Sequence, residues 1–419
     1  MNKLLSFSIA GLIVFLSACT QTQQSAETQE TPLTEEEMVA LADELAHKFI
    51  MVDGHVDLPY RMKVKGFMLK KEVENVSVET EGNFDFPKSK EGGLDAPFMS
   101  IYVPSSYNFK AGAKLFADSL IDMTMNVAAT YPDMFAPART PKDIEENFKK
   151  GLISLPMGME NGAPIEDDLI NVEYFFNRGI RYITLTHSKD NRIADSSYDT
   201  TYTHNGVSSF GEQVIAEMNR VGIMVDISHV SDSAFYDALR LSKAPMIASH
   251  SSCREYTPGF ERNMSDQMIK DLAAKDGVIH INFGSTFLSK RSQDKYDELD
   301  SILTNYRAET GLTRKDSAYN VYAKQVAEDL DVYEDVKMAA QHIHHVVEIA
   351  GIDYVGFGSD FDGVGDSLPK GLKDVSMYPN VILELLKMGY TKEDIEKICY
   401  KNTFRVWNKV IEAAGELNS

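Results

Sequence analysis

Cysteine is scarce in this sequence, with 3 residues among 419, and this scarcity excludes one class of protein. Beyond the N-terminal segment only Cys253 and Cys399 remain, too few for the disulfide framework of a small extracellular domain. We therefore expect no structural disulfide. Stability must come from a buried core instead, and hydrophobic residues, at 43% of the chain, suffice for a large one.

Positive charge is also in deficit. Lys and Arg number 42 against 63 Asp and Glu, so the formal net charge is −21 at pH 7. A surface of that sign repels phosphate groups, which argues against nucleic acid or an anionic membrane surface as a partner. The sequence also lacks repeats of solenoid length, a coiled-coil signature and low-complexity tracts. The composition therefore suits a globular body that stays dispersed.

Long hydrophobic runs are missing, apart from a short one at the N-terminus. Lys3 precedes the apolar stretch Leu4 to Leu16, which is shorter than the roughly 20 residues of a membrane-spanning helix and is typical of an export signal. Small residues before Cys19 resemble a bacterial lipobox, which implies cleavage and diacylation at that cysteine. We therefore expect a signal peptide over 1–18, a flexible tether over 19–34, and a membrane-anchored lipoprotein that faces the periplasm.

Eight short apolar runs alternate with helical patterns along the rest of the chain. They are rich in Val, Ile, Leu and Met without strict alternation, as strands covered on both faces should be. This order predicts an α/β fold, a (β/α)8 TIM-like barrel in a single domain over 35–419, with insertions near 64–95 and 285–331. The runs are 49–52, 96–104, 152–159, 180–186, 222–228, 245–249, 277–283 and 354–359.

Six of these runs end at residues that can bind a metal. Barrel enzymes place their chemistry at the carboxyl ends of the strands, so these side chains should meet at one mouth. Nitrogen and oxygen ligands without thiolates favour Zn²⁺, with Mn²⁺ or Co²⁺ as substitutes, and a bridging carboxylate among so many ligands favours two metal ions. The candidates are His55, Asp57, Glu160, His187, His229, His250 and Asp360.

The motifs around these residues resemble the membrane (renal) dipeptidase family of zinc peptidases, over roughly residues 48–412. The resemblance rests on several motifs jointly, which makes it specific. They are Asp53-Gly54-His55-x-Asp57-Leu58-Pro59, Gly158-x-Glu160-x-Gly162, Thr184-Leu185-Thr186-His187-Ser188, Asp226-x-Ser228-His229-Val230-Ser231, Ser249-His250-Ser251-Ser252, Arg262-Asn263 and Gly356-Phe357-Gly358-x-Asp360-Phe361-Asp362-Gly363-Val364.

The resemblance implies a ligand set for two zinc ions. His55 and Asp57 would bind one ion, His229 and His250 the other, and Glu160 would bridge them. It further implies that a hydroxide held between the metals attacks the peptide carbonyl. Members of the family are often dimers, so a homodimer is consistent with the resemblance, although the sequence itself shows no interface.

The resemblance also implies how a substrate is held. His187 would steady the substrate and the developing oxyanion, Arg262 would take the free carboxylate, and Asp360 would meet the free amino group and shuttle a proton to the leaving amine. These two end contacts would restrict the enzyme to free dipeptides, including those with a C-terminal D-residue. The 285–331 insertion is large, and Asn282-Phe283-Gly284 keeps only part of the family pattern, so side-chain preference stays open.

Other interpretations stay open at this stage. His187 could be a structural hydrogen-bonding residue, Arg262 an ordinary loop arginine and Asp360 a third metal ligand. The activity could be that of another binuclear barrel amidohydrolase, such as a deacetylase or lactonase. The chain could also be a non-catalytic solute-binding lipoprotein. His280 and His342 receive no role in the site.

Overall fold

The structure, a computed structural model, describes residues 33–64 and 74–418. The predicted signal peptide, the lipidation site Cys19 and nearly all of the expected tether lie outside these residues. Among the helices of the described part, none combines the length and the apolar character needed to cross a membrane.

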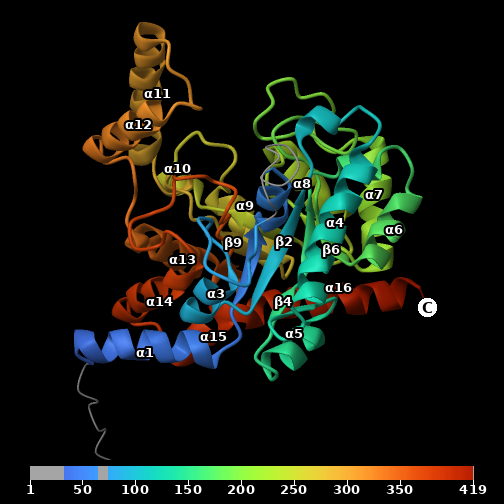
Figure 1. Ribbon diagram of the computed structural model, residues 1–419. Helices are drawn as coiled ribbons and strands as arrows, with labels where there is room; N and C mark the ends of the chain where they lie inside the picture. The colour runs from blue at the N-terminus through green and yellow to red at the C-terminus, as the bar shows by residue number, and fades with distance from the viewer. Residues whose placement is uncertain (1–32, 65–73, 419) are drawn as a thin grey trace, which may run out of the picture.

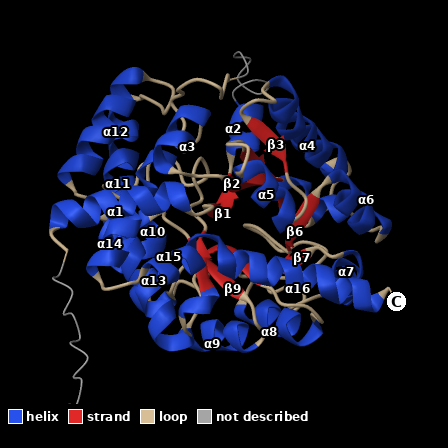
Figure 2. Cartoon of the chain, turned by 90° about the horizontal axis from the view of Figure 1, so that it is seen from below, coloured by secondary structure: helices blue, strands red, loops and turns tan. Residues whose placement is uncertain are grey.

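Eight parallel strands close into a barrel, which confirms the predicted α/β barrel fold (Figure 2). Each strand contains part of one of the eight apolar runs or directly follows it. The last strand pairs with the first, so the sheet has no free edge. Around the barrel the order is β1 (Val52–Val56), β10 (Val355–Phe357), β9 (Val278–Ile281), β8 (Ile247–Ser251), β7 (Met224–Asp226), β6 (Ile180–Thr184), β5 (Met157–Glu160) and β2 (Ala96–Tyr102).

Helices surround the barrel, and several begin at serine or threonine caps. Ser208, Ser231 and Ser265 accept a backbone hydrogen bond at the starts of α7, α8 and α9, and Thr391 forms a capping box at the start of α15. The helices are α1 (Glu35–Lys48), α2 (Leu58–Lys63), α3 (Phe86–Gly92), α4 (Ala113–Thr130), α5 (Pro141–Phe148), α6 (Ile170–Arg178), α7 (Ser209–Val221), α8 (Asp232–Leu241), α9 (Asp266–Ala274), α10 (Ser285–Leu288), α11 (Lys290–Thr310), α12 (Ser317–Asp329), α13 (Val336–Ala350), α14 (Tyr378–Lys387), α15 (Lys392–Glu396) and α16 (Asn402–Leu417).

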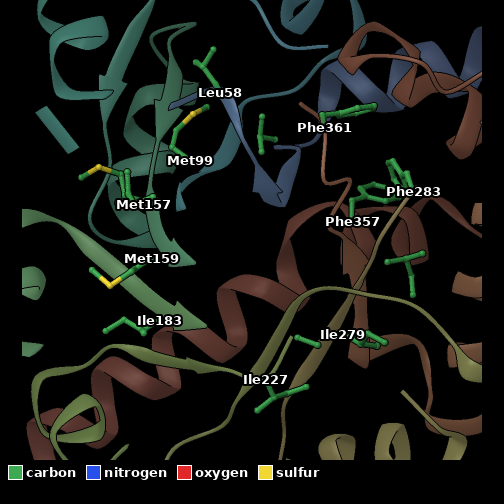
Figure 3. Close-up of a cluster of buried hydrophobic side chains, with 14 of the residues drawn as sticks. Leu58, Met99, Met157, Met159, Ile183, Ile227, Ile279, Phe283, Phe357 and Phe361 are labelled. Atoms are coloured by element: carbon green, nitrogen blue, oxygen red, sulfur yellow. The ribbon is translucent and has the colours of Figure 1, made fainter. Parts of the chain in front are cut away.

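Two layers of apolar side chains hold the barrel. Outward-facing residues such as Met159, Ile183 and Ile279 belong to a large buried cluster shared with the helices (Figure 3). The second cluster contains Trp407 of α16, which is fully buried with its ring centre 5.2 Å from that of Phe98. Helix α16 therefore closes the end of the barrel opposite the carboxyl ends of the strands (Figure 2).

The third apolar run departs from the prediction of one strand. It splits at Pro156 into β4 (Ile153–Leu155), which pairs with β3 (Phe135–Pro137) outside the barrel, and the barrel strand β5. Proline has no N–H for a sheet ladder, so a continuous central strand could not pass through this position. The barrel strand is therefore only the second half of the run.

The 285–331 insertion is helical. It forms α10, α11 and α12, and the last two project from the barrel at the upper left of Figure 1. A small cluster of buried apolar residues holds this projecting hairpin together, separate from the main core. Its buried members are Leu299, Leu303, Tyr319, Ala327 and Val332.

Candidate metal centre

A cavity of about 740 Å³ opens at the carboxyl ends of the barrel strands. Its volume lies in the range of small-molecule binding sites. Of the predicted site residues, Asp57, Glu160, His187, His229 and Asp360 line this cavity. His55 and His250 lie directly behind its wall and have no exposed surface. The barrel thus brings together side chains that are up to 305 positions apart in the sequence, from His55 to Asp360.

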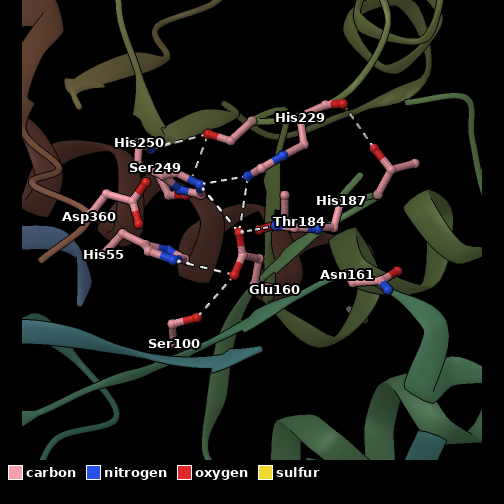
Figure 4. Close-up of polar contacts among 12 residues, drawn as sticks. His55, Ser100, Glu160, Asn161, Thr184, His187, His229, Ser249, His250 and Asp360 are labelled. Carbon is pink, nitrogen blue, oxygen red and sulfur yellow. Dashed lines mark hydrogen bonds and ion pairs between the residues drawn. The ribbon is translucent and has the colours of Figure 1, made fainter. Parts of the chain in front are cut away.

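Glu160, at the end of β5, is the centre of the arrangement (Figure 4). Its Oε1 atom lies 3.0 Å from His229 Nε2 and 3.4 Å from His250 Nε2. Its Oε2 atom lies on the other side, 3.5 Å from His55 Nε2, and that nitrogen is 3.4 Å from Asp57 Oδ2. One carboxylate therefore faces two separate groups of ligand atoms, the geometry expected of a bridging ligand.

The donor atoms fit a divalent metal. His55 Nε2 and Asp57 Oδ1 are buried and have no hydrogen-bond partner among the described residues, and such atoms are costly unless something binds them. The donor atoms form three groups, and the atoms inside each group lie within 4.8 Å of one another. The groups are His55, Glu160 and His250; Glu160, His187 and His229; and His55, Asp57 and Asp360. Nitrogen and carboxylate oxygen donors of this kind are those of zinc sites.

Hydrogen bonds behind the ligands orient two of the imidazoles. His55 Nδ1 lies 2.8 Å from the Tyr182 hydroxyl, which donates to the Gly54 carbonyl at 3.1 Å. The hydroxyl must therefore accept from Nδ1–H, which leaves the lone pair on Nε2 pointing into the site.

The second imidazole is oriented through a carboxylate. Ser249 Oγ lies 2.7 Å from His250 Nδ1 and donates to Asp226 Oδ2 at 2.6 Å. This chain again places the proton on Nδ1 and the lone pair on Nε2. Sequence reasoning assigned no role to Tyr182, Ser249 or Asp226. Ser249 and Asp226 stood within the quoted motifs, whereas Tyr182 gave no signal because it lies in the middle of an apolar run.

A glycine makes room for Tyr182. A Cβ atom on Gly158 would lie 1.9 Å from the Tyr182 ring, far inside van der Waals contact. Gly158 and Glu160 lie on the same face of β5, because side chains alternate along a strand. The glycine of the Gly158-x-Glu160 motif therefore lets the tyrosine reach His55 beneath the centre.

Burial and neighbouring charges shift the pKa values of the residues in the centre in different directions. Burial alone would raise the pKa of Glu160, but the rings of His187 and His55 hold it well below its usual range. Burial lowers the pKa values of His229 and His250 well below normal. Burial also disfavours protonated His55, yet Tyr182, Asp57 and Glu160 raise its pKa. The neighbouring carboxylates therefore favour a positive charge at His55, whereas burial disfavours one at His229 and His250.

Arg262 is a buried cation beside this centre, with 3% of its surface exposed. Its Nη1 and Nη2 donate to Ser251 Oγ and to the His250 carbonyl, both at 2.7 Å. Nε has no partner, and no carboxylate of the described residues forms an ion pair with the guanidinium. Since only two of its five N–H donors are used, the group retains the capacity to bind an anion.

Asp360 and His187 complete the predicted set. Asp360 Oδ2 accepts a hydrogen bond from Asn282 Nδ2 at 2.8 Å, and burial together with the charge of Asp57 raises the pKa of Asp360 well above normal. His187 Nε2 lies 3.5 Å from Glu160 Oε1. Asp360 has a φ of 61° and His229 a φ of 68°, a left-handed conformation that is costly for both and is typical of functional sites.

The residues without a predicted site role lie elsewhere. His280 is buried inside the barrel, where its nitrogens contact the Ala248 carbonyl and the Thr403 hydroxyl. His342 is buried in α13 and accepts from the Cys253 amide through Nδ1. Cys253 and Cys399 are both buried and unpaired.

Solved structures share the fold. The probable dipeptidase PvdM of Pseudomonas aeruginosa is 24% identical, with a TM-score of 0.75 over 90% of this chain and 99% of that one. A metallo peptidase of Rhodobacter sphaeroides, solved with a phosphinate mimic of the dipeptide L-Ala-D-Ala, is 23% identical, with a TM-score of 0.68 over 86% of this chain and 99% of that one.

Two comparisons of sequence identify the family of the chain. An uncharacterized dipeptidase of Schizosaccharomyces pombe is 30% identical over 384 residues, which cover 88% of this chain and 82% of the yeast protein. The sequence profile of membrane dipeptidase (peptidase family M19) matches residues 39–419, which include every barrel strand and every residue of the centre described above. The chain therefore belongs to the membrane dipeptidase family and is a metallopeptidase of that family.

Proposed function

We propose that this protein is a zinc dipeptidase that hydrolyses the peptide bond of free dipeptides, including those with a C-terminal D-residue. The observation that carries the proposal is Glu160, whose two oxygens face separate groups of ligand atoms in a buried centre. The Rhodobacter sphaeroides relative, liganded with a mimic of L-Ala-D-Ala, supports the choice of substrate.

Two zinc ions fit the donor set. His55 and Asp57 would hold one ion, His229 and His250 the other, and Glu160 would touch both. When bound, such ions act as Lewis acids, lowering the pKa of a water molecule and polarising a carbonyl. The lowered pKa values of His229, His250 and Glu160 favour the neutral imidazoles and the ionised carboxylate that this binding requires.

The remaining residues hold the ends of the substrate. Arg262 has three unused N–H donors and no carboxylate partner, so the terminal carboxylate of a dipeptide would compensate its buried charge. Asp360 would receive the terminal ammonium, which would offset the repulsion from Asp57 and stabilise the ionised carboxylate. Asp360 could then carry a proton to the leaving amine, while His187, beside Glu160, would donate to the developing oxyanion.

Hydrolysis of a dipeptide panel by the zinc-loaded full chain tests this function. The panel holds L,L and L,D dipeptides, with N-acetylated and carboxyl-amidated versions as controls. We expect cleavage of the free dipeptides only, because each blocking group removes one end contact. Cleavage of the blocked versions would favour a broader amidohydrolase, such as a deacetylase. No turnover in a zinc-loaded sample would favour a solute-binding protein.

We also propose that Cys19 carries a lipid anchor that holds the enzyme on the periplasmic side of a membrane. The support is the sequence Leu16-Ser17-Ala18-Cys19 after a short apolar stretch. Expression of the full chain and of Cys19→Ala in a bacterium, followed by fractionation, tests this. The wild type should sediment with membranes and the variant should not. An equal distribution of both would contradict the anchor.

A further inference from the structure

The insertion supplies one wall of the cavity. Thr286 and Phe287 of α10 and Tyr296 of α11 line it, together with Val364 and Ser367 from the loop that follows β10. Phe287, Tyr296 and Val364 present uncharged, largely apolar surface, and the same cavity carries carboxylate and imidazole groups of the metal centre. Phe287 lies against Arg262, whose guanidinium is 5.4 Å from the centre of the ring. The cavity, at about 740 Å³, has far more room than two alanine residues would fill.

A second cavity of about 290 Å³ lies next to the first. It shares Tyr296, Val364 and Ser367 with the main cavity and continues between α11 and α12. Its other lining residues are largely apolar: Leu299, Leu303, Ala323, Ala327 and Tyr333, with Asn320, Lys324 and Asp366. The Tyr296 hydroxyl donates to the Asp366 carbonyl at 3.1 Å, so the ring stands at the boundary between the two cavities.

Gly284 allows two side chains of the cavity wall to pack closely against it. A Cβ atom on Gly284 would lie 2.9 Å from the Phe287 ring and 3.1 Å from a Val364 methyl group. Glycine at this position therefore lets both side chains pack where a larger residue would stand. The segment Asn282-Phe283-Gly284 keeps only part of the family pattern, and the insertion begins immediately after it.

The position of the wall relative to Asp360 indicates which part of a substrate it meets. The Val364 amide donates to the Asp360 carbonyl at 3.3 Å, and Gly363 also lines the cavity. Asp360 is the residue proposed to meet the substrate ammonium. The side chain on the amino-terminal residue would therefore leave the backbone next to Val364, which lines both cavities together with Tyr296.

We propose that Tyr296 and Val364 form a subsite for a large apolar or aromatic side chain on the amino-terminal residue of the dipeptide, a proposal that rests on the dipeptidase function proposed above. The second cavity, behind Tyr296, gives space for the far end of such a side chain. The insertion thereby sets a preference for dipeptides such as Phe-Ala over Ala-Ala or Glu-Ala.

Steady-state kinetics of the zinc-loaded full chain test the subsite. We expect kcat/KM for Phe-Ala to exceed that for Ala-Ala by about 10-fold or more, since each apolar group buried in a fitting pocket contributes to discrimination. The position-swapped Ala-Phe should show no comparable gain. Glu-Ala should fall below Ala-Ala, because its carboxylate would be buried against an apolar wall.

Two variants and one control locate the effect. Tyr296→Ala should lower the Phe-Ala to Ala-Ala ratio several-fold by removing the boundary ring. Ala323→Phe should lower the same ratio by filling the second cavity, and it retains the wall itself. Tyr322→Ala is the matched control, because Tyr322 lies on the same hairpin, stacks on Tyr306 at 3.9 Å and lines neither cavity. The control should keep the wild-type ratio.

The outcomes separate the two proposals. Hydrolysis of all dipeptides with equal kcat/KM for Phe-Ala and Ala-Ala overturns the subsite and leaves the dipeptidase function intact. A ratio that neither Tyr296→Ala nor Ala323→Phe changes, or a gain for Ala-Phe instead of Phe-Ala, overturns it as well. Hydrolysis of no dipeptide at all overturns the function and the subsite together.

Discussion

The metal centre and the insertion face the same cavity, yet their side chains are held by different means. His55 and His250 have no exposed surface, and Glu160 retains 4%. The first two each donate a hydrogen bond from Nδ1 to a barrel residue, Tyr182 and Ser249 respectively. The hairpin of α11 and α12 depends instead on its own small cluster, in which Leu303 retains 9% exposure.

This difference assigns metal binding to the barrel and substrate choice to the hairpin. Ligands on a closed barrel are positioned by a continuous hydrogen-bonded sheet and by packing from all sides. A hairpin that packs mainly on itself can change without moving the ligands. The comparison therefore predicts that changes in the barrel act on metal binding, whereas changes in the hairpin act on stability of the hairpin and on substrate choice.

The largest effect should follow Glu160→Gln. The glutamine amide is neutral and has a single oxygen, so it cannot serve as a ligand to two metal ions. We therefore expect loss of at least one metal ion and a fall in kcat of about 10³-fold or more. Metal content after dialysis and dipeptide hydrolysis measure this. Glu212→Gln, on the exposed first turn of α7, is the matched control and should keep both. Two bound ions and full activity in Glu160→Gln would contradict the bridging role.

A smaller effect on metal binding is expected from the hydrogen bonds behind the ligands. Ser249→Ala removes the link between His250 and Asp226, and Tyr182→Phe removes the acceptor of His55 Nδ1–H. Loss of such contacts typically weakens metal affinity by about 10–100-fold. Competition with a chelator, read as zinc released against chelator concentration, measures the change. Wild-type affinity in both variants would show that packing alone positions the imidazoles.

The hairpin should respond to Leu303→Ala without any change at the metals. Truncation of a buried leucine costs about 2–4 kcal/mol, here in the local stability of α11 and α12. We expect faster amide hydrogen exchange over residues 290–330 and unchanged exchange in the barrel strands. Zinc content should stay at the wild-type value. Loss of zinc in this variant would show that the hairpin and the centre are coupled, which would break the comparison.

A buried carboxyl at the other end of the barrel should affect stability alone. Asp95 precedes β2 and accepts a hydrogen bond from the Met51 amide at 3.0 Å, and burial raises the pKa of Asp95 to about 7. Folding therefore binds a proton, so the stabilising effect is complete below the unfolded pKa near 3.8 and is lost as pH rises toward 7.

Asp95→Asn should remove this dependence. We expect the variant to exceed the wild type in free energy of unfolding by about 1–3 kcal/mol at pH 8, with the difference shrinking toward pH 4. Urea denaturation at pH 4.5 and pH 8 measures it, with metal content as the control. A difference that is independent of pH would mean that the Asp95 carboxyl is ionised in the folded protein.

The barrel, and the meeting of the candidate ligands at one end of it, were predictable because both follow local rules. Each strand overlaps a short apolar run, and Glu160 and His250 follow the ends of such runs directly. Parallel strands in one barrel bring these ends to one mouth. The alternation of apolar runs and helices is therefore enough to predict that the candidate ligands lie close together. The capping serines and Thr391 are local signals of the same kind.

Other features could not be predicted, because they depend on which segments become neighbours. Tyr182 and His55 are 127 positions apart, and nothing in either segment marks the other. The hairpin of α11 and α12 was not expected to be helical, since its few buried apolar residues are spread among charged ones. The split of the third run at Pro156 depended on β3, a strand with no pattern of its own.

The sequence by itself thus determined the fold class, the order of strands and helices, and the residue types at the strand ends, because hydrophobic periodicity and metal-ligand chemistry are properties of short segments. Only the tertiary structure decided which nitrogen of each imidazole faces the centre, how Arg262 came to be buried without a carboxylate partner, and which wall the insertion builds. These depend on burial and on contacts between distant segments, which exist only once the barrel has closed.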